Sequence, residues 1–318
     1  MTVYTNFIGI DIGKFEFFTN IYPDRQVNCY ENTQEGIKKF LQKHKEPLSE
    51  QGLCVLESTG GYEMELLTAL CDQAHTVHRA DGYQVKHFIR SYRKQAKTDK
   101  LDAQALALYG YERHVTLACY QPSSDKQLML CEFATRRREL TTLLVAEKNR
   151  LQAPKTRWTK DSCQTLIQTI ESELRQIESE MEQIINQDER LKAKQKALKS
   201  IPGIGEKISK DLLAMLPELG RIDRRKIAAL VGLAPRANDS GKRLGYRSTG
   251  YGRAGVKPLL FIAAMAAGNS HSSLKAFYEE LVAKGKPKKV ALIALARKIL
   301  VIANARVKEV VTQEISEK

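Results

Sequence analysis

Short blocks of apolar residues recur over the first 110 positions, and the spacing between them changes along the chain. Three strands are predicted first, over residues 3–12, 15–22 and 26–31, with a turn at Pro23-Asp24. Helices and strands then alternate. We expect helices over 34–44, 62–74, 83–94 and 99–109, and strands over 53–56 and 76–79.

The middle of the chain has a helical period instead. Residues 124–199 are charged, poor in glycine and contain one proline, Pro154, which should separate two long helices. In the second helix the apolar residues are spaced by four, three, four and three positions, which is typical of a coiled-coil seam. These residues are Ile170, Leu174, Ile177, Met181 and Ile184. Such a seam packs either inside the protein or against a second protomer, and we favour a second protomer.

Short helices separated by glycine-rich turns are expected after Lys199. The segment Ser-Ile-Pro-Gly-Ile-Gly-Glu-Lys-Ile-Ser at 200–209 has the turn of a helix-hairpin-helix, whose backbone N–H groups can approach a phosphate. Gly203, Gly205 and Lys207 would make this contact; the alternative is a tight turn that only packs helices. Helices are predicted over 256–267 and 274–283, and a last one ends near 307.

These patterns predict an α/β domain followed by helical ones. A strand meander followed by alternating helices and strands is the order of a ribonuclease H-like α/β domain, which we expect over residues 1–122. A helical hairpin that serves as coiled-coil linker and oligomerisation region should follow over 123–198. A mostly α, basic domain with the helix-hairpin-helix should occupy 199–318.

The distribution of charge points to a polyanionic partner. The net charge is +14, of which residues 199–318 contribute +13, with 23 basic and 10 acidic side chains. No stretch approaches the length of a membrane span and no signal peptide is recognisable, so we expect a cytoplasmic or nucleoid location and no membrane partner. The six cysteines lack metal-ligand spacing and are expected to be reduced.

Four carboxylates at the ends of predicted strands and at the start of a predicted helix are candidate metal ligands. Asp99 and Asp102 lie three residues apart at the start of a helix, although Thr98 as N-cap would also explain acidic residues there. Asp11 interrupts a buried strand, and Glu57 ends the apolar run 53–56. A salt bridge of Asp11 with Lys14 and a loop role for Glu57 are the alternatives. Together, these oxygen ligands suit Mg²⁺ or Mn²⁺.

Basic residues near these carboxylates suggest a nucleic-acid substrate. Residues 79–100 interleave cations with Tyr83, Phe88 and Tyr92, although a solvated basic helix is an equal alternative. The cations expected to contact nucleic acid here are Arg90, Arg93, Lys94 and Lys97.

A second candidate centre lies in the glycine-rich basic loop within residues 227–255. Ser240 stands among arginines that could stabilise charge on a phosphoryl group, so it is a candidate nucleophile. By composition alone a loop serine is more often a turn residue, and Ser248 or Ser270 would be equal candidates. The basic residues expected to bind nucleic acid here are Arg236, Lys242, Arg243, Arg247 and Arg253.

Several ordered motifs resemble one family. They are Gly-Ile-Asp at 9–11, Glu-Ser-Thr-Gly-Gly-Tyr at 57–62, Ala-Lys-Thr-Asp-Lys-Leu-Asp-Ala at 96–103, Ile-Pro-Gly-Ile-Gly at 201–205, and Gly-Leu-Ala-Pro-Arg with Ser-Gly at 232–241. The chain resembles the DEDD insertion-sequence transposases, which are bridge-RNA-guided recombinases related to Piv-type DNA invertases. Phe17-Phe18 and Tyr251-Gly-Arg253 depart from the pattern of that family.

The resemblance implies specific roles. Asp11, Glu57, Asp99 and Asp102 would form the metal-binding tetrad of a ribonuclease H-like (RuvC-like, Holliday-junction-resolvase-like) domain, and Ser240 would bond covalently to DNA. It also implies donor and target DNA, a structured guide RNA, and a homodimer or homotetramer in which two domains form one composite site.

Three functions are therefore compared. The first is a DNA transposase or recombinase that passes through a phosphoserine link. The second is a metal-dependent junction endonuclease in which Ser240 is structural. The third is a noncatalytic nucleic-acid-binding protein, against which the four coincident carboxylates argue.

Overall fold

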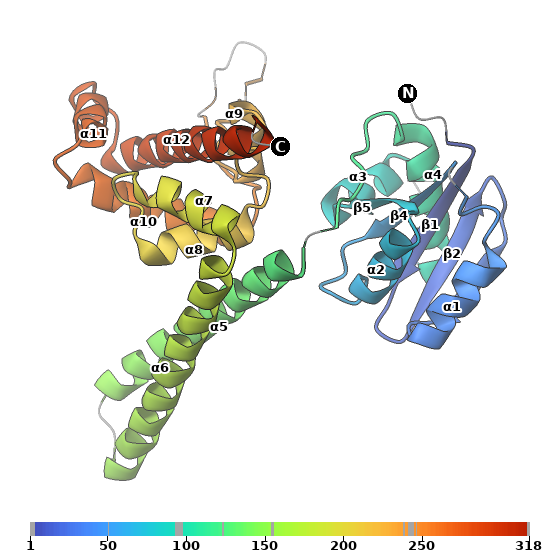
Figure 1. Ribbon diagram of the computed structural model, residues 1–318, viewed down its shortest axis with the longest axis horizontal. Coiled ribbons are helices and arrows are strands. Elements are labelled where there is room, and N and C mark those ends of the chain that lie inside the picture. Colours follow the sequence, from blue (N-terminus) through green and yellow to red (C-terminus); the bar gives the residue numbers. More distant parts are fainter. Residues whose placement is uncertain are drawn as a thin grey trace. The chain divides into compact units, whose positions relative to one another are not determined.

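The chain forms two compact units, residues 1–122 and 123–318, and each is described by itself. The computed structural model describes residues 4–49, 51–92, 98–122, 124–153, 156–237, 239–240, 245 and 247–316. Figure 1 labels most of the helices and strands of both units.

Within its described residues, the first unit is built on a mixed sheet of five strands. The strands are β1 (Asn6–Ile12), β2 (Glu16–Tyr22), β3 (Val27–Glu31), β4 (Gly52–Glu57) and β5 (Thr76–Ala80). Their order across the sheet is β3-β2-β1-β4-β5. The first three strands form the antiparallel meander expected from the sequence, and β4 and β5 run parallel to β1 and to each other. This order is consistent with a ribonuclease H-like fold.

Helices cover both faces of this sheet (Figure 1). Ile8, Ile10 and Leu56 pack with α1 (Gln34–Lys43) and α2 (Met64–Asp72) on one face. Phe7 and Val55 point to the other face, toward α3 (Gly82–Ser91) and α4 (Asp99–Arg113). Because successive side chains of a strand alternate between faces, Asp11 lies on the α3 and α4 side of the sheet, with Phe7 and Gly9.

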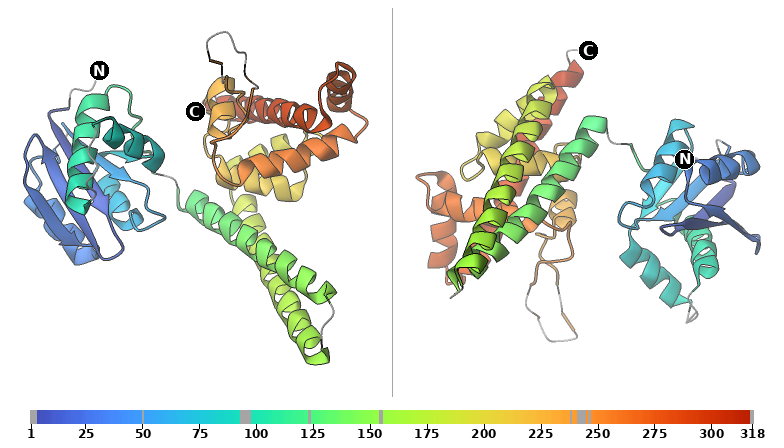
Figure 2. Two further views of the ribbon diagram at one scale, coloured as in Figure 1. Left: turned by 180° about the vertical axis from the view of Figure 1, so that it is seen from behind. Right: turned by 90° about the horizontal axis from the view of Figure 1, so that it is seen from below.

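The second unit begins with a helical hairpin. Helices α5 (Asp125–Gln152) and α6 (Arg157–Asn186) lie side by side in Figures 1 and 2. The start of α5 and the break after it agree with the prediction of two long helices over 124–199. The second predicted helix is divided, because α6 ends at Asn186 and a separate helix begins at Glu189. The seam residues Ile177, Met181 and Ile184 are buried in the core of this unit, and Ile170 and Leu174 pack against it. The seam is therefore used for internal packing, the alternative that we did not favour.

Six further helices are described in the second unit and pack around that core. They are α7 (Glu189–Lys199), α8 (Glu206–Met215), α9 (Arg224–Leu230), α10 (Val256–Gly268), α11 (Ser273–Ala283) and α12 (Lys288–Ser316). The last helix continues beyond the predicted end near Val307 to Ser316. Val311, which lies beyond that end, also packs against the core of this unit. In the described part of the chain, no helix is both long and apolar enough to cross a membrane.

Candidate active site at the acidic edge of the sheet

The register of two parallel strands brings the first two carboxylates together. Ile10 of β1 pairs with Leu56 of β4, so the next residues of the two strands are Asp11 and Glu57. Neighbouring residues in register on parallel strands project to the same face. Both side chains are half-buried and stand where their strands end. The C-terminal end of β4 therefore lies beside that of β1.

Helix α4 runs antiparallel to β1 across that face. The ring of Phe7 lies 5.5 Å from the ring of Tyr111, near the end of α4. Two residues along β1, a Cβ placed on Gly9 would lie 2.1 Å from the Ala103 carbonyl oxygen and 2.2 Å from the Ala107 nitrogen. Gly9 therefore lets α4 pack directly against the strand. Continuing in this direction, the end of β1 points toward the first turn of α4.

That first turn carries the other two carboxylates. Asp99 is the first residue of α4 and is exposed, whereas Asp102 is half-buried. The Thr98 hydroxyl caps the helix by accepting a hydrogen bond from the Leu101 amide at 3.3 Å. Because the cap uses the threonine, capping does not exclude a functional role for the two acids. We call Asp11, Glu57, Asp99 and Asp102 the acidic edge.

Gly82 makes room for the Glu57 carboxylate. A Cβ placed on Gly82, the first residue of α3, would lie 2.3 Å from Glu57 Oε1. The carboxylate therefore lies against the start of α3, where the helix dipole favours a negative charge. Sequence reasoning missed this contact, because Gly82 is 25 residues from Glu57 and resembles an ordinary turn glycine.

The chemistry of the acidic edge fits a divalent cation. Carboxylate oxygens are the ligands that Mg²⁺ and Mn²⁺ prefer, and four of them project from two strand ends and one helix turn. Among the residues that the structure describes, however, no three carboxylate, imidazole or thiol groups stand close enough together to hold one metal ion. The fold thus supplies the ligand types on neighbouring elements, without a ready-made coordination shell.

A buried carboxylate that the sequence did not reveal fixes the loop after Glu57. Glu63 is fully buried, and its Oε2 accepts hydrogen bonds from the Thr59 amide (3.2 Å), the Thr59 hydroxyl (3.0 Å) and the Gly61 amide (2.9 Å). Its Oε1 pairs with the Arg79 guanidinium, which also donates to the Ser58 hydroxyl at 3.0 Å. Arg79 is therefore neutralised by Glu63.

These contacts also set the ionisation of Glu63. Burial opposes the charged form, but hydrogen bonds from its own amide, from Arg79, from Gly61 and from Thr59 outweigh burial and hold the pKa of Glu63 at about 2. The only sequence signal for this role is a glutamate placed just before an apolar helix, which usually indicates a cap.

The cations predicted beside the acidic edge are only partly described. Arg90, which was predicted to contact nucleic acid, is exposed in the last turn of α3. Arg93, Lys94 and Lys97 lie outside the described residues, as do Lys242 and Arg243 of the serine loop.

Ser240 is exposed in the segment between α9 and α10. The neighbouring Asp239 carboxylate accepts hydrogen bonds from the Gly245 amide at 3.0 Å and from the Arg247 guanidinium at 2.8 Å. Arg247 is thus paired inside the loop. Asp239 thereby joins the two sides of the loop next to Ser240.

The base of the same loop is closed by backbone contacts. The Arg236 and Ser248 backbones pair as an isolated antiparallel bridge, and the Arg236 guanidinium lies 4.8 Å from the centre of the Tyr251 ring. Gly252 packs so closely on Gly232 that a Cβ on Gly252 would lie 2.1 Å from the Gly232 nitrogen. Glycine at both positions is required for this approach.

Arg253 anchors the end of the loop. Its guanidinium donates to the Met215 carbonyl oxygen at 2.6 Å and to the Glu218 carboxylate at 2.8 Å. Sequence reasoning assigned Arg253 to nucleic acid, but it could not show this partner 35 residues away.

The predicted helix-hairpin-helix turn joins α7 to α8. The three residues of this segment that were predicted to contact a phosphate have different surroundings. Gly203 has a φ of +90°, and a Cβ on it would lie 2.2 Å from the Ala263 carbonyl oxygen of α10. Gly203 therefore serves packing, which was the alternative reading of this turn. Gly205 is the N-cap of α8 and faces open space.

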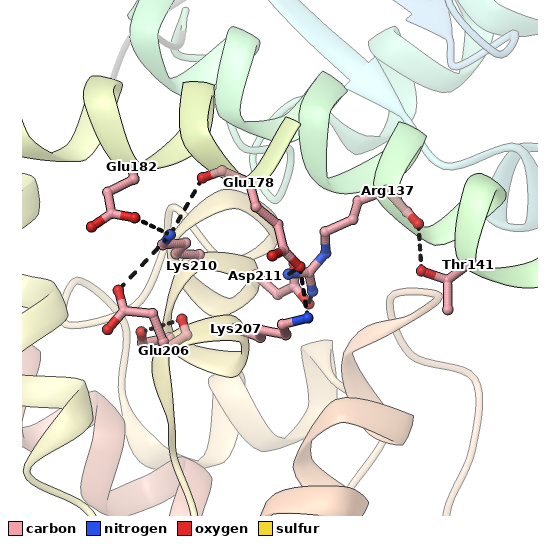
Figure 3. A network of polar contacts seen from close by, with 9 residues as sticks. Arg137, Thr141, Glu178, Glu182, Glu206, Lys207, Lys210 and Asp211 are labelled. Atoms are coloured by element: carbon pink, nitrogen blue, oxygen red, sulfur yellow. Dashed lines mark hydrogen bonds and ion pairs between the residues drawn. The ribbon is translucent and has the colours of Figure 1, made fainter. Parts of the chain in front are cut away.

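Lys207 belongs to a polar network between α5, α6 and α8 (Figure 3). Its ammonium lies 2.8 Å from Glu178 Oε1, and Arg137 pairs with both Glu178 and the buried Asp211. Lys210, which is also buried, pairs with Glu182 at 3.2 Å. Lys207 is thus one of several cations that tie the hairpin to α8.

Known proteins share similarity with most of the chain. A model of DEDD transposases of the IS110 type, described as transposase, matches residues 8–154, and a model described as transposase IS116/IS110/IS902 family matches residues 195–279. Pilin gene-inverting proteins of Moraxella lacunata and Moraxella bovis are each 29% identical to the chain over 313 residues, which cover 95% of the chain and 96% of each relative. Residues 8–154 and 195–279 therefore match models of IS110-type transposases. These matches and the gene-inverting relatives indicate an enzyme that cleaves and rejoins DNA strands.

Proposed function

We propose that this protein is a DNA transposase or site-specific recombinase in which the acidic edge binds a divalent cation, Mg²⁺ or Mn²⁺, and Ser240 is the nucleophile. The main support is the register of β1 and β4, which makes Asp11 and Glu57 neighbours on the face where α4 begins with Asp99 and Asp102. Four carboxylates on adjoining elements are uncommon unless a cation or a polar network compensates them.

Ser240 would act by covalent catalysis. Its Oγ attacks the phosphorus of a DNA phosphodiester, and the bond from phosphorus to the leaving deoxyribose oxygen breaks. The proton of the serine ends on the released hydroxyl. Attack by the hydroxyl of another strand reverses these changes and regenerates Ser240, so strands are exchanged without hydrolysis. A bound divalent cation would neutralise the charge that develops on the phosphoryl oxygens. The exposure of Ser240 and the bracing of its loop by Asp239 and Arg247 support this role.

The role of the carboxylates is tested by a matched pair of substitutions. Asp99 and Asp125 each follow a hydroxyl N-cap, Thr98 or Ser124, and each is the first residue of its helix. Asp99→Asn and Asp125→Asn therefore lose the same favourable interaction with the helix dipole. We expect Asp99→Asn to lower Mg²⁺-dependent strand cleavage at least about 100-fold and Asp125→Asn to leave it unchanged. Equal activity of both variants would contradict the proposal.

The alternative, a junction endonuclease without serine chemistry, gives a different result with Ser240→Ala. A nuclease in which the acidic edge activates water keeps cutting after this substitution. The proposed transposase loses both cleavage and rejoining. Ser248→Ala is a suitable control, because Ser248 lies on the other side of the same loop.

A structured guide RNA and a dimeric or tetrameric assembly are further parts of the proposal, and their support is the resemblance in sequence motifs. Sequencing the RNA and DNA that co-purify with the protein tests the RNA. One recurrent RNA with complementarity to the bound DNA is expected, and only random cellular RNA would speak against guidance. Light scattering with and without that RNA tests the assembly.

A further inference from the structure

Exposed aromatic side chains gather where three strands of the sheet end. Phe15 is 76% exposed in the turn after β1, Tyr62 is 49% exposed in the loop after β4, and Tyr83 is 62% exposed at the start of α3, just after β5. Since β1, β4 and β5 are parallel, these three positions lie at one edge of the sheet. A single exposed ring is ordinary, whereas several at one edge are typical of a binding surface.

Asn32 braces two of these positions. Its backbone N–H donates to the Phe15 carbonyl oxygen at 2.8 Å. Its side-chain amide donates to the Gly13 carbonyl oxygen at 3.1 Å and to the Tyr62 carbonyl oxygen at 3.0 Å. One residue therefore joins the turn after β1 to the loop after β4, so Phe15 and Tyr62 are presented from a connected backbone.

Glu63 holds the Tyr62 loop from its other side and limits what that loop can bind. A glycine-rich loop that opens a helix often binds phosphate through its amides. Here the amides of Thr59 and Gly61 already donate to the Glu63 carboxylate. A negative charge thus occupies the position that a phosphate would need, and Tyr62 is what the loop offers to a ligand.

The aromatic positions adjoin the acidic edge and a cation. Tyr83 follows Gly82, which lies against the Glu57 carboxylate. The centres of the Tyr83 and His87 rings lie 4.3 Å apart. The Lys14 ammonium lies 5.2 Å from the centre of the Phe15 ring. Ring faces with a nearby cation are the combination that binds single-stranded nucleic acid.

We propose that Phe15, Tyr62 and Tyr83 form an aromatic edge on which unpaired bases of the DNA stack, next to the phosphate that the acidic edge acts on. Bases within a duplex have no free faces, so this surface selects strand ends, bubbles or junctions over intact duplex. The inference rests on the proposed function for the nearby phosphate, but stacking itself can be measured without cleavage.

The test uses the full-length protein and an oligonucleotide duplex with a central bubble that contains 2-aminopurine. Stacking on an aromatic ring quenches the fluorescence of this base analogue. We expect Tyr62→Leu and Tyr83→Leu each to weaken binding of the bubble about tenfold and to remove quenching, with unchanged affinity for intact duplex. Tyr62→Phe and Tyr83→Phe keep the ring and should behave as the wild type. Phe15→Leu should resemble the other leucine variants.

Trp158→Leu is the matched control, because Trp158 is 79% exposed but belongs to α6 of the other unit. Unchanged quenching and affinity in all three leucine variants would overturn the aromatic edge, as would equal losses in the phenylalanine variants. Leucine variants that lose cleavage but quench normally would also overturn it, because the rings would then affect cleavage without stacking on bases.

Asp102→Asn separates this inference from the proposed function. If both hold, this variant quenches 2-aminopurine normally and does not cleave. If it cleaves normally, the role of the acidic edge fails, while the quenching results still decide the aromatic edge.

Discussion

Gly82 leaves the Glu57 carboxylate the space that it occupies. Gly82→Ala would place a methyl carbon 2.3 Å from Glu57 Oε1, so the flexible carboxylate must move away. Since the position tolerates alanine in a helix, we expect little change in the free energy of unfolding, within about 1 kcal/mol. Strand cleavage should fall at least about tenfold, because small displacements at reacting groups are costly. A parallel loss of stability and activity would argue that Gly82 is only structural.

The low pKa of Glu63 leads us to expect that the protein loses stability in acid. Its pKa of about 2 lies below the ordinary 4.5, so the unfolded chain binds more protons between these two values. The stabilisation is therefore complete above about pH 4.5 and is lost as the pH falls toward 2. It amounts to at most about 3 kcal/mol.

Glu63→Gln should remove this pH dependence, and urea unfolding between pH 3 and 7 measures it. The variant is expected to be less stable than the wild type at pH 7, with the difference shrinking toward pH 3. Glu65→Gln is the control, since Glu65 is exposed on the same helix. If Glu63→Gln and Glu65→Gln give the same pH profile, the buried pair with Arg79 is not what stabilises the loop.

Helices α5, α6 and α8 meet at the buried ion pair of Arg137 and Asp211. Unlike the pKa of Glu63, the pKa of Asp211 is raised. Burial raises the pKa of Asp211 to about 6, although the neighbouring Arg137 lowers it, and Glu178 adds to the rise. The folded protein therefore binds a proton that the unfolded chain releases between about pH 4 and 6. Stability of the second unit should fall as the pH rises through this window.

Asp211→Asn should flatten that part of the pH profile, and Asp161→Asn, an exposed position on α6, should not. Thermal unfolding followed by circular dichroism at pH 4, 5, 6 and 7 provides the comparison. A wild-type protein whose second unit gains stability from pH 4 to 6 would contradict the assignment.

The helices and strands of the first unit could be predicted because their buried positions form runs and periodic patterns of apolar residues along the chain. The strands that carry Asp11 and Glu57 are apolar runs buried on both faces. A carboxylate at the end of such a run is therefore easily recognised in the sequence. Periodicity also located the hairpin of α5 and α6. It could not show that the face of Ile177 and Met181 packs internally, because an apolar stripe does not identify what covers it.

Contacts between distant residues could not be predicted in the same way. Glu63 with Arg79, Glu57 with Gly82 and Arg253 with Glu218 each join separate elements. Spacing along the chain carries no information about such pairs. For the same reason, sequence reasoning could not show that Arg247 and Arg253, which it assigned to nucleic acid, have carboxylate partners within the protein.

Over the whole chain, charge and chemistry are divided between the two units. The acidic edge belongs to residues 1–122, whereas residues 199–318 carry a net charge of +13. A protein consisting of residues 123–318 should therefore bind duplex DNA without the first unit. Its affinity, measured by fluorescence anisotropy, should fall roughly 1,000-fold between 50 and 200 mM salt. Tighter duplex binding by residues 1–122 would contradict this division.

The most direct test of the proposed mechanism is capture of a covalent link between Ser240 and DNA. The full-length protein is mixed with its co-purified nucleic acid and Mg²⁺, denatured and digested, and the peptide that contains Ser240 is examined by mass spectrometry. We expect a nucleotide adduct on Ser240 in the wild type and none in Ser240→Ala or Asp102→Asn. An adduct that persists in both variants would contradict the proposed roles of the serine and of the acidic edge.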